Sequence, residues 1–149
     1  MSLNFRPACA SDAQAVIELA VESVSRDPLP VTVDREAMRE TFMAVVGKPA
    51  HFVWVGEQDG VVVAAVAAVT QQSFWFTRQQ CSVLLYYSRA KGAGMPLLQE
   101  LAKWIKSRPV IKLAVVELEP GASPALVRAF RRLGFSRQSA NLAFVRGQA

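Results

Sequence analysis

The residues best suited to chemistry form a short glycine-rich turn, Arg89-Ala90-Lys91-Gly92-Ala93-Gly94. The turn lies between an apolar run that predicts a strand over residues 80–87 and a segment with helical spacing that begins at Gly92. Glycine permits a positive φ and a close approach of a ligand to the backbone, and the first amides of a helix lack intrahelical partners. Arg89 and Lys91 add positive charge beside these amides. The turn therefore predicts an anion site that suits a pyrophosphate.

The spacing of the glycines excludes two familiar nucleotide-binding loops. The chain contains no G-x-x-x-x-G-K-[ST] sequence and no G-x-G-x-x-G sequence, and its first strands are predicted to be antiparallel, unlike those of a Rossmann domain. The alternative to an anion site is a tight turn from strand to helix, in which the glycines serve packing and the two cations are solvated.

Metal chemistry has little support in the sequence. The two cysteines, Cys9 and Cys81, are far apart, and His51 is the only histidine. Zinc sites need several such ligands at short spacings. We therefore expect no metal site, and no nucleophilic cysteine is evident. We expect His51 to lie at a strand end or on the surface.

The composition is that of a folded domain. The chain has 149 residues, of which 52% are hydrophobic and 19% charged, so we expect one domain over residues 1–149. The net charge of +5 suits a polyanionic partner, which could be nucleic acid, a membrane surface or a phosphorylated cofactor. No apolar stretch reaches the roughly 20 residues of a membrane helix, and the N-terminus lacks the apolar core of a secretory signal. A cytoplasmic protein without a membrane span is expected.

The elements that must position the turn can be predicted from hydrophobic spacing and from helix and hairpin signals. Ser11 and Gln14 form an S-x-x-Q capping box ahead of a first helix, Asp34 is the N-cap of a second, and Asp59-Gly60 predicts a hairpin. Ser123-Pro124 predicts the start of a last helix, which ends at Gly134. The expected strands are residues 3–7, 51–58, 61–71, 80–87, 110–118 and 135–145.

The predicted fold class is α+β with three layers. The order of elements is β-α-α-β-β-β-α-β-α-β. The strands of the first half are expected to be antiparallel, whereas strand-helix-strand connections are expected in the second half. The central sheet should therefore be mixed and mostly antiparallel.

These features together resemble the GNAT superfamily of acyl-CoA-dependent N-acyltransferases. Arg89, Gly92 and Gly94 match the R/Q-x-x-G-x-G/A turn of that family, and residues 123–135 resemble its N-x-x-A-x-x-L-Y-x-x-x-G-F segment. The order of elements matches the family fold, so the resemblance covers nearly the whole chain.

The resemblance implies acetyl-CoA as the co-substrate and assigns residues to it. The backbone of Leu84, Leu85 and Tyr86 would pair with the pantetheine arm, and the acyl group would lie where the strands 80–87 and 110–118 splay apart. Ser123 stands in the place of the family Asn and is counted with the cofactor-binding positions, although a role as N-cap is the alternative. The amides that would cradle the pyrophosphate belong to Arg89, Ala90, Lys91, Gly92, Ala93, Gly94 and Met95.

The catalytic groups depart from the family pattern. The family tyrosine that often protonates the leaving thiolate is Phe130 here, which we expect to be a core residue. Glu117 is the candidate base, because it continues the phase of Ile111, Leu113 and Val115 and would be the polar end of a buried strand face. Its alternative is a strand-end residue that reaches solvent. Tyr86, and also Tyr87, could donate or relay a proton, and both could equally be core or edge aromatics.

The leading functional hypothesis is transfer of an acetyl group from acetyl-CoA to a primary amine of a small molecule or peptide, by direct attack in a ternary complex. A second hypothesis is a catalytically weak or inactive acyl-CoA-binding module. A third is a nucleic-acid binder, suggested by the net charge and by a cluster of arginines near the last helix; nucleic acid is the less favoured partner, because a CoA ligand accounts for much of the charge. The arginines of this cluster are Arg128, Arg131, Arg132 and Arg137.

The acceptor would be recognised by the first two helices, by the connection 27–30 between them, and by the aromatic residues 74–76. An apolar sheet edge or this aromatic loop could also support a homodimer.

Overall fold

The computed structural model describes residues 2–26, 32–118 and 122–147. The predicted acceptor-recognition segment 27–30 thus lies outside the described residues. The elements are β1 (Leu3–Pro7), a 3₁₀ turn η1 (Ala10–Asp12), α1 (Ala13–Arg26), α2 (Arg35–Val45), β2 (Phe52–Gln58), β3 (Val61–Gln72), β4 (Gln79–Ser88), α3 (Gly94–Lys106), β5 (Ile111–Val116) and α4 (Pro124–Arg132). None of the helices in the described part of the chain is long and apolar enough to cross a membrane.

The strands form one sheet in the order β1-β2-β3-β4-β5. Neighbouring strands are antiparallel except β4 and β5, which are parallel. Short turns join β2 to β3 and β3 to β4 and reverse the chain, whereas the crossover helix α3 returns it in the same direction between β4 and β5. β1 and β2 are antiparallel although α1 and α2 lie between them. The predicted mixed, mostly antiparallel sheet is confirmed.

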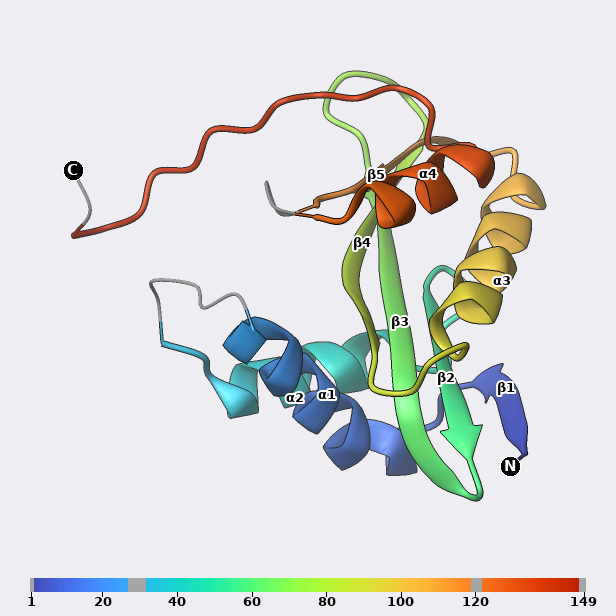
Figure 1. Ribbon diagram of the computed structural model, residues 1–149. Helices are drawn as coiled ribbons and strands as arrows, with labels where there is room; N and C mark the ends of the chain where they lie inside the picture. The colour runs from blue at the N-terminus through green and yellow to red at the C-terminus, as the bar shows by residue number, and fades with distance from the viewer. Residues whose placement is uncertain (1, 27–31, 119–121, 148–149) are drawn as a thin grey trace.

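Two hydrophobic clusters place a helical layer on each side of the sheet (Figure 1). On one side, α1 and α2 contribute buried residues such as Leu19 and Phe42 against Val55 of β2. On the other side, α3 contributes Leu97, Leu98 and Leu101, and α4 contributes Phe130. The predicted three-layer α+β arrangement is therefore confirmed.

The hairpin predicted at Asp59-Gly60 joins β2 to β3. Both residues have positive φ, 52° and 80° respectively. Two consecutive left-handed residues are typical of the turn that matches the twist of antiparallel strands. The antiparallel pairing of Gln58 with Val61 directly beside the turn confirms the predicted hairpin.

The predicted capping box at Ser11 and Gln14 is wrong. The chain turns two residues earlier: Cys9 is the N-cap of η1, and the Asp12 carboxylate accepts a hydrogen bond from the Cys9 amide at 2.8 Å. Gln14 instead donates to Glu18 one turn along α1. Arg6 donates two further hydrogen bonds to the Asp12 carboxylate, at 2.8 and 2.9 Å. These bonds hold the carboxylate where it can accept the Cys9 amide at the start of the helix.

The closing strand predicted over residues 135–145 is also absent from the described structure. Only Phe135 joins the core, where its ring packs edge-on against Phe130 at 5.4 Å. Residues 136–147 form an extended segment that leads away from the sheet (Figure 1). Residues 136–141 are polar or small and lack an apolar alternation, so they provide no face that would hold the segment against its own sheet.

Candidate functional site

The site begins where β4 and β5 part. The two strands pair from Gln79 and Ile111 to Val83 and Val116. β4 then continues for five more residues, to Ser88, without β5 beside it. Backbone groups of this last part of β4 have no strand partner on the β5 side within the described structure. The splay expected from the sequence lies at Val83 and Val116.

A β-bulge coincides with the parting of the strands. The register between β3 and β4 passes from Ala68 and Val83 directly to Ala67 and Leu85, so Leu84 has no partner in β3. Leu84 is 56% exposed. A bulge bends a strand and turns unpaired backbone groups outward, and it is common beside functional sites. Leu84, and those main-chain groups of Leu85 and Tyr86 that point away from β3, therefore offer donors and acceptors at the opening.

The glycine turn follows at the end of β4 and leads into α3, a helix of 13 residues. Gly92 has a φ of 84°, which favours glycine over any side chain. The Ala93 amide donates to the Ala90 carbonyl at 3.2 Å, and the Ser88 hydroxyl donates to the same carbonyl at 2.7 Å. These two bonds close the turn locally.

The first turn of α3 has no capping side chain. Its N-cap is Ala93, which is fully buried and cannot accept a hydrogen bond through its side chain. The amides of Gly94 and Met95 at the start of the helix are therefore available to an anion, and the helix dipole favours negative charge at this end. This is the geometry expected of a pyrophosphate cradle, with Gly92 and the helix start side by side.

Gly94 lies close to the end of β4. A Cβ at this position would lie 3.3 Å from the Tyr86 hydroxyl and 3.4 Å from the Cβ of Ser88, tighter than ordinary contact. Tyr86 is half-buried and packs edge-on against Phe130, with ring centroids 5.6 Å apart. Burial raises the pKa of the Tyr86 phenol above its ordinary value near 10. The phenol therefore stays protonated at neutral pH and sits beside the turn.

Arg89 does not extend into the turn. Its Nε donates to the Glu22 carboxylate of α1 at 3.0 Å, and this ion pair lowers the pKa of Glu22. The charge of Arg89 is thus balanced by Glu22, whereas Lys91 is exposed and forms no ion pair among the described residues. Glu22 was not singled out from the sequence, because the two residues are 67 positions apart and no local signal links them.

The phase argument for Glu117 is wrong in one respect. The register of β4 and β5 skips Lys112, because Gln79 pairs with Ile111 and Gln80 with Leu113. This bulge reverses the alternation: Ile111 is buried, but Leu113 is 44% exposed. Glu117 therefore follows the open face of β5, and its side chain is exposed rather than the end of a buried face.

Two further positions have the structural roles that the sequence indicated. The Ser123 hydroxyl oxygen accepts the Leu126 amide at 3.2 Å, so Ser123 is the N-cap of α4. Phe130 is 2% exposed and belongs to the core. Both are in the layer that also holds Tyr86. His51, before β2, accepts the Thr70 amide through Nδ1 at 3.1 Å, which agrees with a role at a strand end.

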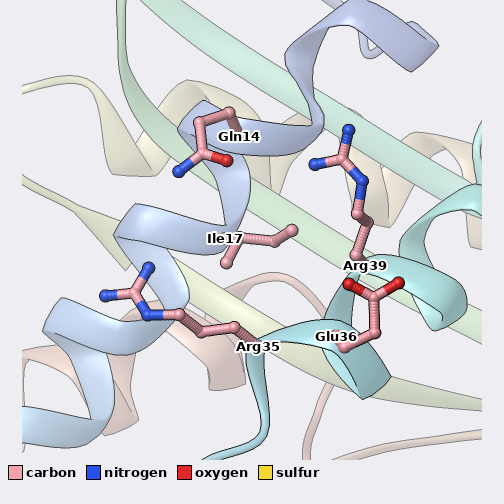
Figure 2. Close-up of a pocket in the computed structure, with 5 residues that line it drawn as sticks. All are labelled: Gln14, Ile17, Arg35, Glu36 and Arg39. Atoms are coloured by element: carbon pink, nitrogen blue, oxygen red, sulfur yellow. The ribbon is translucent and has the colours of Figure 1, made fainter.

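The described structure has two grooves that contain none of the residues predicted to bind the cofactor or to catalyse the reaction. One lies between α1 and α2, has a volume of about 110 Å³, and brings Arg35 and Arg39 of α2 toward Gln14 of α1 (Figure 2). The other, about 230 Å³, lies beside Trp54 and Trp104. Among the described residues no group of three or more His, Cys, Asp or Glu side chains could hold a metal ion.

Comparison with known proteins gives the fold a name. No protein-family model matches the sequence, and no curated protein matches it in sequence. In contrast, a predicted acetyltransferase from Clostridium acetobutylicum, solved with acetyl-CoA, matches the structure with a TM-score of 0.74 at 16% identity, over 97% of this chain and 96% of that one. The chain has the GNAT fold.

Other GNAT-fold structures match over similar lengths. Glucosamine-6-phosphate N-acetyltransferase from Arabidopsis thaliana has a TM-score of 0.71 at 17% identity, over 98% of this chain and 99% of that one. An aminoglycoside acetyltransferase from an uncultured soil metagenomic sample has a TM-score of 0.68 at 12% identity, over 99% of this chain and 97% of that one. The resemblance predicted from the glycine turn and the order of elements is thus confirmed at the level of the fold.

Proposed function

We propose that the protein is an N-acetyltransferase that moves an acetyl group from acetyl-CoA to a primary amine of a small molecule or peptide. The observation that carries the proposal is the parting of β4 and β5 beside a glycine turn that leads into an uncapped helix start. The parted strands leave room for an extended ligand, and the turn supplies donors for a polyphosphate. A GNAT-fold structure solved with acetyl-CoA supports the choice of ligand.

The residues at the opening fit acetyl-CoA in their chemistry. Those backbone groups of Leu84, Leu85 and Tyr86 that point away from β3 would pair with the amides of the pantetheine arm, as an added strand pairs with a sheet edge. The amides from Arg89 to Met95 would face the pyrophosphate, except that of Ala93, which is bonded within the turn, and that of Arg89, which donates to the Val63 carbonyl at 2.8 Å. Lys91 would supply charge, since Arg89 is paired with Glu22.

The reaction is a direct attack in a ternary complex. The amine nitrogen forms a bond to the acetyl carbonyl carbon, the carbon-sulfur bond breaks, the amine loses a proton and the departing thiolate gains one. An amine of pKa about 10.4 is neutral in fewer than about one molecule in a thousand at pH 7, so a base is needed. Glu117, exposed beside the parting strands, is the proposed base, acting directly or through water.

Tyr86 is the proposed acid that protonates the thiolate. Its phenol is kept protonated by burial and packs against Phe130, the residue that replaces the family tyrosine. A thiol of pKa about 8.5 leaves readily, so the demand on this acid is modest. The exposed Ser123 hydroxyl at the start of α4 can still donate a hydrogen bond to the cofactor while its oxygen caps the helix.

Calorimetric titration of the protein with acetyl-CoA and with CoA tests the proposal. Saturable binding of both ligands is expected, followed by release of free thiol when a panel of primary amines is added. Binding without thiol release from any amine would favour the alternative of an inactive acyl-CoA-binding module. Absence of binding to either ligand would overturn both.

A further inference from the structure

The loop between β3 and β4, residues 73–78, holds two aromatic side chains in solvent. Phe74 is 88% exposed and Trp75 is 84% exposed. The loop extends beyond the end of the sheet, at the top of the view in Figure 1. Two hydrogen bonds fix its backbone, from the Ser73 amide to the Arg78 carbonyl at 3.1 Å and from the Trp75 amide to the Ser73 hydroxyl oxygen at 3.2 Å. Large apolar side chains exposed side by side on such a loop indicate a contact surface.

The two rings, Phe74 and Trp75, form a small apolar wedge. They pack edge-to-face, with ring centroids 4.9 Å apart and ring planes at 87°. Neither ring belongs to the two hydrophobic clusters that join the helices to the sheet. The wedge therefore contributes little to the packing of the domain, and its apolar surface is free to contact a partner.

A cluster of basic residues lies at the base of the loop. The Gln79 amide donates to the Val110 carbonyl at 3.0 Å, and Gln79 pairs with Ile111 of β5. These contacts bring the turn between α3 and β5 beside the loop. The residues at this junction include four cations, here called the basic cluster: Arg78, Lys106, Arg108 and Lys112. Arg108 is half-buried, with its guanidinium stacked on the Trp104 ring at 5.2 Å, and the other three are exposed.

The charge of the basic cluster is not balanced. None of its members forms an ion pair with another described residue. From residue 60 to residue 116 the sequence contains no Asp or Glu except Glu100, and that carboxylate pairs with Lys103 at 3.1 Å. The glycine turn follows the other end of β4, so this positive charge is separate from the proposed cofactor site. An unbalanced positive surface thus borders the apolar wedge.

We propose that this end of the molecule binds the surface of an anionic lipid bilayer. The wedge would enter the headgroup layer, where tryptophan rings are favoured, and the basic cluster would lie against the lipid phosphates. The two parts need each other, because a small apolar anchor without electrostatic attraction gives only weak and reversible binding. The proposal is carried by this combination of apolar side chains at the tip and unbalanced cations behind them.

The shape of the wedge favours a bilayer over a nucleic acid, the other polyanion that the charge suits. Single-stranded nucleic acids bind in a positively charged groove and stack their bases on open ring faces. Here the two rings contact each other at the tip of a loop, and neither groove described above is lined by a residue of this loop. A fluid headgroup layer needs no matching groove.

Co-sedimentation with vesicles tests the proposal. The protein should sediment with vesicles of phosphatidylglycerol and phosphatidylcholine in equal parts and stay in solution with phosphatidylcholine alone, and added salt should weaken the binding. Phe74→Ser/Trp75→Ser and Lys106→Gln/Lys112→Gln should each lower the affinity by about tenfold or more. The matched controls, which should bind as the parent does, remove exposed side chains of the same kinds elsewhere: Leu142→Ser/Phe144→Ser, and Arg35→Gln/Arg39→Gln on α2.

Fluorescence distinguishes insertion of the wedge from adhesion through charge alone. Lipids with brominated chains should quench the tryptophan emission of the protein on anionic vesicles. Trp75→Phe should remove this quenching, because Trp54 and Trp104 are half-buried and lie outside the loop. Vesicle binding without quenching would contradict the insertion and overturn the proposal.

Three other results would also overturn it. The parent protein does not bind anionic vesicles, the wedge variant binds them as the parent does, or light scattering shows a dimer that Phe74→Ser/Trp75→Ser converts to a monomer. Binding of a single-stranded oligonucleotide that the wedge variant loses, in the absence of vesicle binding, would assign the surface to nucleic acid instead. None of these measurements needs acetyl-CoA, so a failure here is distinguishable from a failure of the proposed function.

Discussion

At the scale of single residues, the two adjacent tyrosines of β4 have separate environments. Tyr86 packs with Phe130 beside the glycine turn, whereas Tyr87 lies on the other face, buried with α1 and α2 and with Arg26 stacked over its ring at 5.3 Å. Burial raises the pKa of both phenols. Only Tyr86 lies beside the glycine turn, so the pair provides an internal comparison.

Tyr86→Phe should lower kcat by about 10- to 100-fold while acetyl-CoA affinity changes by less than about twofold, because the phenol is needed for proton transfer and not for binding. Because burial raises the pKa of Tyr86, the phenol stays protonated to a higher pH than an ordinary tyrosine, and the rate of the parent enzyme should fall only at strongly alkaline pH. Tyr87→Phe is the control and should keep kcat within about twofold. Steady-state kinetics from pH 6 to pH 10.5 would decide; equal rates for Tyr86→Phe and the parent remove Tyr86 from the mechanism.

Glu117→Gln should lower kcat by about 100-fold and leave the affinity for acetyl-CoA unchanged, since an amide cannot accept the amine proton. A higher pH should restore part of the rate, because more of the acceptor is then neutral. Glu100→Gln, which alters a carboxylate paired with Lys103 on α3, is the matched control. An unaltered rate at every pH would show that another group or water takes the proton.

At the scale of elements, the proposed CoA site consists of a bulge, a turn and a helix start that follow one another along β4 and α3. Two glycines of the chain have nearly the same backbone but different surroundings: Gly92, with φ 84°, is in this turn, and Gly60, with φ 80°, is in the hairpin of β2 and β3. A Cβ would meet nothing within 4 Å at either position.

Gly92→Ala and Gly60→Ala should therefore each lower the free energy of unfolding by a similar amount, about 1 kcal/mol, because alanine is strained at positive φ. Only Gly92→Ala should weaken acetyl-CoA binding, by about tenfold or more, because it disturbs the amides that face the pyrophosphate. Denaturant unfolding and calorimetry of both variants check the two statements. Equal acetyl-CoA affinity in the two variants would place the phosphate elsewhere.

At the scale of the whole molecule, one ion-pair network ties the N-terminal strand to the rest of the sheet. Arg6 of β1 bonds to Asp12 of η1 and to Glu57 of β2, at 2.8 and 2.6 Å respectively. The Arg6 hydrogen bond lowers the pKa of Asp12 from 3.8 to about 2, against the opposing effect of burial. The network stabilises the point where the chain leaves the sheet and enters α1.

The lowered pKa of Asp12 predicts an acid-sensitive contribution to stability. Because the carboxyl titrates lower in the folded state, its stabilisation, about 2 kcal/mol, is fully present above pH 4 and is lost as the pH falls toward 2. Asp12→Asn should lose this amount at pH 7, and the difference from the parent should shrink between pH 4 and pH 2. Glu18→Gln, which affects an exposed pair with Arg35, should cost less than about 0.5 kcal/mol. Urea unfolding across this pH range measures both, and a constant difference for Asp12→Asn would contradict the assignment.

The sequence by itself determined the features that depend on neighbouring residues. The hairpin at Asp59-Gly60, the N-caps at Asp34 and Ser123, and the glycine turn were all predicted where they are found, because turn and cap signals act over only a few residues. The glycine turn, the segment 123–135 and the order of the elements together predicted the GNAT fold.

Only the tertiary structure decided the features that depend on partners distant in sequence. The bulges at Leu84 and Lys112 exist only in relation to the neighbouring strand, and the second of them moved Glu117 to an open face. The Glu22–Arg89 ion pair joins α1 to the turn. Because of this pair, Lys91 and not Arg89 is the cation of the turn whose charge no described carboxylate balances. Register and long-range pairing arise from how strands and helices pack, and no local pattern in a single sequence encodes them.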